Sequence, residues 1–274
     1  MENIKKRLIF SFVINILLIV FFIICIIINI ININNNPNSL YQNVWGLFRY
    51  FTIDGNLVSW VFTIIIWSKQ IQALKLPKDG NIREKIVTHF LYIISLISAC
   101  NDIIIFIVVV LVFLPLSNKA WIKSLIGSFG SATLHIVIPV LIIFRFLFLD
   151  IKERDLKIYE KIYGAFPMIA YGIIMYILCG AKAFTSFDKR EGDGRVPYPF
   201  FDVYHQPWYF CLFVALFIIV FGFFISVLFD FLNKKSYNLI FPCEKLQMIE
   251  EALVCDDDQR IFPDSNDDKE QNKN

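Results

Sequence analysis

Six long apolar stretches, separated by short polar segments, dominate the pattern of the chain. Their approximate bounds are 8–31, 46–68, 87–114, 125–149, 160–181 and 208–231. A run of about 20 apolar residues, rising 1.5 Å per residue, crosses a hydrocarbon layer of about 30 Å. Strands of a membrane barrel instead alternate apolar and polar positions over about ten residues. The pattern therefore predicts an all-α, polytopic membrane protein built as a bundle of six transmembrane helices.

The composition agrees with a membrane protein. Hydrophobic residues make up 57% of the chain and charged residues 18%, with a mean hydropathy of +0.61, whereas soluble domains are roughly half apolar and a quarter charged. The sequence contains no phosphate-binding loop and no dinucleotide fingerprint. These features favour a lipid environment, and they indicate neither a bound cofactor nor nucleic-acid binding.

The basic residues predict the orientation of the spans, because short cytoplasmic loops are enriched in Lys and Arg. Three basic residues precede the first span, five lie in 69–87 and three in 150–158. The alternate loops hold none in 32–45, two in 115–124 and four in 182–207. We therefore expect both termini on the cytoplasmic side.

The chain divides into a transmembrane domain, 1–235, and a C-terminal tail, 236–274. Within the tail, residues 244–274 hold ten Asp or Glu against four Lys or Arg. A segment this acidic and this poor in apolar residues buries too little surface to fold alone. We expect a disordered cytoplasmic tail.

Polar residues recur at helical spacing on three consecutive spans, so each helix turns a polar line to one side. Small and hydroxylated residues also pack helices together in lipid, and this packing is the simplest interpretation of the serines and threonines in these lines. The three lines comprise Thr52, Asn56, Ser59 and Thr63; Thr88, Ser95, Ser98 and Asp102; and Ser128, Ser131, His135 and Pro139.

Two members of these lines, Asp102 and His135, are harder to explain as packing residues. An Asp within a span costs about 2.5–3.5 kcal/mol on insertion scales, so it indicates function by default. A hydroxyl nucleophile, an imidazole base and a carboxylate that orients the imidazole are the parts of a nucleophilic hydrolase. We therefore predict that Thr52 meets His135 in the outer half of the bundle and that Asp102 orients the imidazole.

Four segments resemble a known family: "YFTIDGNL" on the second span, "LHIVIPVLIIFRFLFLD" on the fourth, "IYGAFPMIAYGIIMYI" on the fifth and "VPYPFFDV" before the sixth. They are similar to the bacterial six-span integral membrane family and its eukaryotic counterpart, the androgen-induced membrane hydrolases. The resemblance covers about residues 45–231.

The resemblance implies a threonine hydrolase that cleaves fatty-acid esters of hydroxy fatty acids. Carried over by motif, the nucleophile is Thr52 and its partner is His135. Relatives tend to show Thr-Ile-Gln-Ser-Asn where this chain has Asp54 and Gly55 before Asn56. Asn56, one turn from the threonine, is placed to donate a hydrogen bond to the developing oxyanion.

The family turn before the sixth span is expected outside the membrane, folded over the mouth of the cavity. It contains Tyr198, Pro199, Phe200 and Asp202, and His205 follows. Zinc sites take three or four ligands and the chain has only three histidines, so we expect no metal site here.

Two charged positions near the inner ends of spans have simple interpretations. Arg145 and Asp150 close the fourth span, where a snorkelling side chain and a local ion pair are expected. His89, at the start of the third span, is expected at the interface.

The sequence leaves other function classes open. The same polar lines would suit a small transporter or a lipid-binding membrane protein without catalytic activity, with Pro139 and Pro167 as possible kinks. Transporters often show related halves and broken helices, and neither is clear in the sequence. The third hypothesis is a membrane scaffold protein whose polar residues serve only helix packing.

Overall fold

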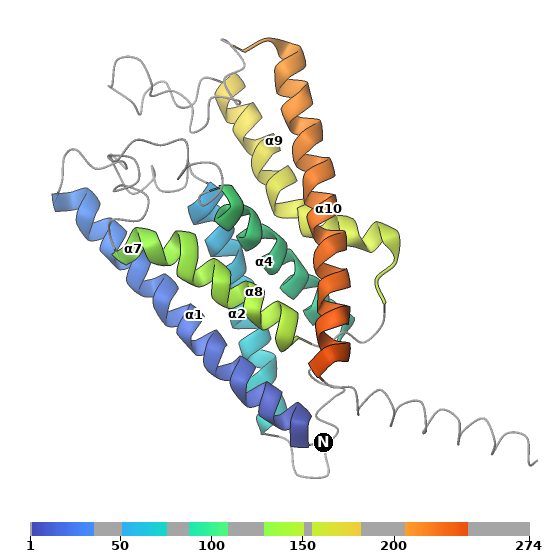
Figure 1. Ribbon diagram of the computed structural model, residues 1–274. Coiled ribbons are helices and arrows are strands. Elements are labelled where there is room, and N and C mark those ends of the chain that lie inside the picture. Colours follow the sequence, from blue (N-terminus) through green and yellow to red (C-terminus); the bar gives the residue numbers. More distant parts are fainter. Residues whose placement is uncertain are drawn as a thin grey trace, which may run out of the picture. The chain divides into compact units, whose positions relative to one another are not determined.

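The computed structural model describes residues 2–35, 51–75, 88–108, 129–150, 155–181 and 206–240. All regular elements in this part of the chain are helical, and Figure 1 shows their arrangement. They are α1 (Glu2–Asn35), α2 (Phe51–Leu74), α4 (His89–Ile107), α7 (Phe129–Ala132), the π-helical turn η3 (Thr133–Val137), α8 (Ile138–Phe148), the 3₁₀ helix η4 (Ile158–Ala165), α9 (Phe166–Gly180) and α10 (Trp208–Ile240).

Six helices are long and apolar enough to cross a membrane, so the predicted fold class is confirmed. Their spans are Lys6–Ile31, Phe51–Leu74, His89–Ile107, Phe129–Phe148, Glu160–Gly180 and Trp208–Ser236. Large apolar side chains cover the outside of the bundle, as expected for a protein surrounded by lipid. On α10, for example, Phe213 and Val220 are both 65% exposed.

The spans alternate in direction, so the start of α1 and the end of α8 lie at one end of the bundle. There, Arg7 on α1 donates a hydrogen bond of 2.8 Å to the carbonyl oxygen of Phe148. Gln70, near the end of α2, donates to the first turns of α1. At the start of α4, the Tyr92 hydroxyl donates over 2.9 Å to Asp230 in the last third of α10. We call this end of the bundle the basal end.

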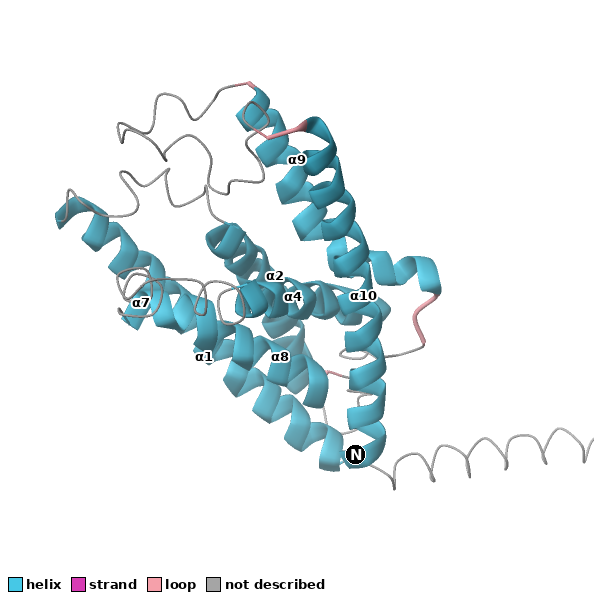
Figure 2. Cartoon of the chain, turned by 45° about the horizontal axis from the view of Figure 1, so that its top comes forward, coloured by secondary structure: helices cyan, strands magenta, loops and turns pink. Residues whose placement is uncertain are grey.

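Helix α4 forms the centre of the bundle. Seventy-two per cent of its apolar window is buried, compared with 22% for α10. It packs against α2, α8 and η4, while α1 packs against α2 and α8. Figures 1 and 2 both show α1, α2, α4 and α8 close together. Consequently, polar side chains on the inner faces of these four helices have no access to lipid.

Small residues let η4 and α10 approach closely. A Cβ added at Gly164 on η4 would lie 2.5 Å from Ser226 Oγ and 2.8 Å from Cys100 Sγ. One added at Gly222 on α10 would lie 2.8 Å from the Cβ of Ala165. The backbones meet here because no side chain separates them, as is common in helix packing within membranes.

Residues 1–233 form one compact unit and residues 234–274 a second one. The sequence predicted this division after residue 235. Most of the predicted acidic tail, from residue 241 onward, lies outside the described residues.

Candidate functional site

The polar line predicted on α2 faces the interior of the bundle. Asn56, Ser59 and Thr63 are 1%, 0% and 0% exposed, respectively. Thr52, at the start of the helix, is only half-buried. The stripe thus begins at a half-buried threonine and continues into buried polar side chains.

Asn56 links the two segments that carry the predicted nucleophile and base. Its Nδ2 donates over 2.6 Å to the carbonyl oxygen of Thr52 and over 3.2 Å to that of Leu134. Leu134 precedes His135 in the chain, so the backbones at 52 and 134 are neighbours across the α2–η3 contact. Both amide protons of Asn56 are used by these carbonyls, and an oxyanion would have to compete with them.

His135 lies in a π-helical turn, and the following proline explains that turn locally. Pro139 has no N–H to donate to the carbonyl of His135, which removes one α-helical bond. The N–H of Ile138 instead donates to the carbonyl of Thr133, five residues back. π-Turns occur often at functional sites. The imidazole is 8% exposed, and its Nδ1 has no hydrogen-bond partner among the described residues.

Asp102 is completely buried on α4 and contacts Ser59 rather than the imidazole. The Ser59 hydroxyl donates a short hydrogen bond to Asp102 Oδ2. No hydrogen bond joins Asp102 to His135 within the part of the chain that the structure describes, and Asp102 Oδ1 has no partner there. The predicted orienting contact is therefore not formed in this arrangement.

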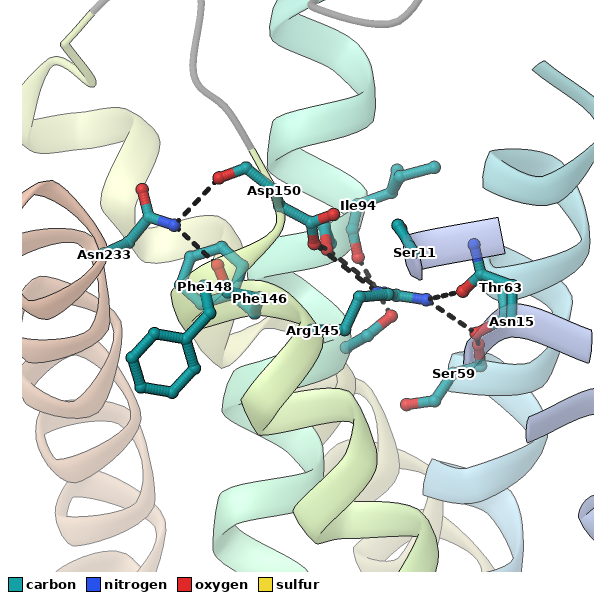
Figure 3. A network of polar contacts seen from close by, with 12 residues as sticks. Ser11, Asn15, Ser59, Thr63, Ile94, Arg145, Phe146, Phe148, Asp150 and Asn233 are labelled. Carbon is teal, nitrogen blue, oxygen red and sulfur yellow. Dashed lines mark hydrogen bonds and ion pairs between the residues drawn. The ribbon is translucent and has the colours of Figure 1, made fainter. Parts of the chain in front are cut away.

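A larger polar cluster surrounds Arg145 on α8, and helical periodicity alone did not predict it. The guanidinium donates to Asn15 Oδ1 at 2.7 Å, to Thr63 Oγ1 at 3.2 Å and to Ser95 Oγ at 3.1 Å. Its Nε lies 3.5 Å from Asp150 Oδ2. Figure 3 shows Arg145 between Asp150 on one side and Asn15 and Thr63 on the other. We call the whole set the Arg145 cluster: Ser11, Asn15, Thr63, Gln70, Ser95, Arg145 and Asp150.

The snorkelling predicted for Arg145 is wrong, whereas the ion pair with Asp150 is confirmed. Arg145 is 0% exposed because acceptors on α1, α2 and α4 satisfy its guanidinium inside the bundle. A helix-end arginine extends to water only when the bundle offers no such partners.

A second set of polar contacts lies at the basal end. His89 Nε2 and Glu160 Oε1 are 3.1 Å apart, and Lys161 forms an ion pair of 2.9 Å with Asp230. Asn233 donates to the carbonyl oxygens of Phe146 and Asp150, as Figure 3 shows. His89 is half-buried against η4 and contributes to helix packing, while its expected position at the membrane interface stays a prediction.

Several predicted positions fall where the structure gives no description. Ser128 and the turn residues Tyr198, Pro199, Phe200, Asp202 and His205 all lie outside the described residues. Among those that are described, no group of three or more His, Cys, Asp or Glu side chains is placed to hold a metal ion.

Comparisons with family models, curated proteins and solved structures found no match to this chain. The site is therefore interpreted from its own geometry.

Proposed function

We propose that this integral membrane protein is a threonine hydrolase that cleaves fatty-acid esters within the bilayer. The observation that carries the proposal is the Asn56 side chain, which binds the backbone next to both the candidate nucleophile and the candidate base. Thr52 is the accessible member of an otherwise buried polar line. Together they favour chemistry at the α2–η3 contact over chemistry deeper in the bundle.

In the proposed reaction, Thr52 Oγ1 attacks the ester carbonyl carbon while its proton passes to a ring nitrogen of His135. The tetrahedral intermediate expels the alkoxide, which takes the proton from the imidazolium, and the acyl group stays on the threonine. Water, deprotonated by the same imidazole, then releases the fatty acid. A threonine hydroxyl is a weak nucleophile without such a base, and His135 supports the role because no described residue engages its Nδ1.

We test the proposal with a fluorophosphonate probe on membranes that express the full chain. Wild type and Thr52→Ser are expected to be labelled, whereas Thr52→Val, which keeps the shape but lacks the hydroxyl, and His135→Gln are not. Ser68→Ala is the matched control, because the Ser68 hydroxyl lies on the same helix and donates only to its own backbone at Ile65. Labelling that persists at equal expression in Thr52→Val would exclude this threonine as the nucleophile.

One observation favours the alternative, a transporter or lipid-binding protein without catalysis. The completely buried carboxylate of Asp102 lies within a span and has an oxygen without a partner among the described residues. Such residues often mark ion or substrate pathways in membrane proteins. A wild type that reacts with neither the probe nor lipid esters would favour this class.

We also propose that the basal end faces the cytoplasm. Basic residues gather there, as expected from the retention of Lys and Arg on the cytoplasmic side. Among the described residues they include Lys6, Arg7, Lys69, Lys75, Lys157 and Lys161.

A further inference from the structure

The contact between α2 and α4 holds a buried carboxylate that has no ion-pair partner among the described residues. Asp102 is 0% exposed, and no ion pair joins it to a Lys, Arg or His within the described residues. Arg145 is near enough to interact electrostatically, but it pairs with Asp150. A buried charge without compensation costs several kcal/mol. The ionised form of Asp102 therefore has no ion-pair partner among the described residues, and a bound cation would compensate its charge.

The α2–α4 contact contains buried oxygens that have no hydrogen donor among the described residues, beside the one donor that Ser59 supplies to Asp102. Ser59 Oγ binds Asp102 Oδ2 and also accepts from Asn101 Nδ2 over 3.3 Å, so both residues of α4 meet at the same hydroxyl. Asp102 Oδ1 and Asn101 Oδ1 are buried and have no donor among the described residues. Asn56 Oδ1, about one turn from Ser59 on the same face of α2, is in the same situation.

Gly55 lets the Asn101 amide lie directly on the backbone of α2. A Cβ at this position would lie 2.7 Å from Asn101 Nδ2 and 2.8 Å from its Oδ1. Gly55 thus allows Asn101 and Ser59 to share one small region beside the carboxylate.

We propose that Asp102, Asn101 and Ser59 form a binding site for a monovalent metal cation between α2 and α4, with Asn56 as a further oxygen ligand. Carboxylate, amide and hydroxyl oxygens suit hard cations. One carboxylate balances one positive charge, whereas a divalent ion would leave an excess charge in a low-dielectric interior. The site shares Asn56 with the proposed hydrolase, but it needs neither the Thr52 hydroxyl nor the imidazole.

The test is the thermal unfolding of the purified full chain in detergent, measured in NaCl, KCl and choline chloride at equal ionic strength. A ligand that binds only the folded state stabilises it in a saturable way. We expect the unfolding midpoint to rise with Na⁺ or K⁺ and to saturate, with no such rise in choline. Asp102→Asn, which keeps the shape and removes the charge, is expected to abolish the rise.

Ser98→Ala is the matched control, since Ser98 lies one turn before Asp102 and, among the described residues, donates only to its own helix at Ile94. The rise of its unfolding midpoint with Na⁺ or K⁺ should equal that of the wild type. If Asp102→Asn does not fold, Asn101→Ala decides, with at least a tenfold weaker apparent affinity expected. Equal midpoints in all three salts, a response that follows pH alone, or an unchanged affinity in Asn101→Ala would each overturn the proposal. None of these readouts involves ester cleavage, so they stand apart from the probe experiment on Thr52.

Discussion

Replacing Arg145 with methionine tests how strongly the Arg145 cluster holds the bundle together. The guanidinium bridges α8 to three other helices through Asn15, Thr63 and Ser95. Methionine fills a similar volume without donors, so the substitution leaves these acceptors unpaired while largely preserving packing. We expect the variant to insert and fold, but with a lower free energy of unfolding.

The size of the loss follows from two contributions. Hydrogen bonds between membrane helices average about 0.6 kcal/mol in double-mutant cycles, so the three bonds of Arg145 contribute about 2 kcal/mol together. Breaking a buried ion pair costs about 3–5 kcal/mol because one charge stays behind, but Asp150 is 12% exposed at the end of α8 and keeps some solvation. We therefore expect a total loss of about 3–5 kcal/mol for Arg145→Met.

A double-mutant cycle separates the two contributions. Asp150→Asn removes the charge that Arg145→Met leaves behind, so the double variant should recover about 1–3 kcal/mol relative to the sum of the single losses. Arg145→Lys keeps the charge but lacks the planar guanidinium, so its free energy of unfolding should lie between those of the wild type and Arg145→Met. The free energy of unfolding is measured by reversible denaturation in mixed micelles. A loss below about 1 kcal/mol for Arg145→Met, or strict additivity with Asp150→Asn, would refute the reasoning.

Two further predictions concern packing and orientation. Gly164→Ala should lower the free energy of unfolding by about 1–3 kcal/mol through overpacking, because its Cβ would lie 2.5 Å from Ser226 Oγ. Gly172→Ala is the control, and it should be neutral or slightly stabilising because nothing lies within 4 Å of the added Cβ. Equal effects of the two changes would contradict this prediction. Cys243 and Cys255 in the tail should react with a membrane-impermeant maleimide only after cells are permeabilised. The variant with both cysteines replaced by serine is the control. Labelling of these two cysteines in intact cells would reverse the proposed orientation.

The fold was predictable because the spans are continuous apolar runs, but their ends depend on partners that a single sequence does not reveal. The sixth span was expected to end at residue 231, whereas α10 continues to Ile240. Asp230 and Asn233 stay helical and buried because Tyr92 and the Phe146 carbonyl satisfy them. Polarity alone made this segment look like the end of the span.

The candidate site was only partly predictable for a related reason. Periodicity identifies the residues that share a face of one helix, so the burial of Asn56, Ser59 and Thr63 was foreseeable. It does not give the rotation of one helix against another. The sequence therefore paired Asp102 with an imidazole where the structure pairs it with Ser59. Pro139 was expected only as a possible kink, whereas the structure has a π-helical turn at Thr133–Val137 just before it.

The links around Arg145 also bear on how the chain is made. Its three hydrogen-bond acceptors, Asn15, Thr63 and Ser95, all precede it in the sequence and sit on helices that leave the ribosome earlier. An arginine in a lone span is costly to transfer into lipid, by about 2.5–3.5 kcal/mol on translocon scales. When the fourth span emerges, its acceptors already lie in the membrane, and the segment can leave the translocon by docking onto them. The order of the helices along the chain is thus also an order of assembly, in which each earlier helix prepares the environment for the most polar one.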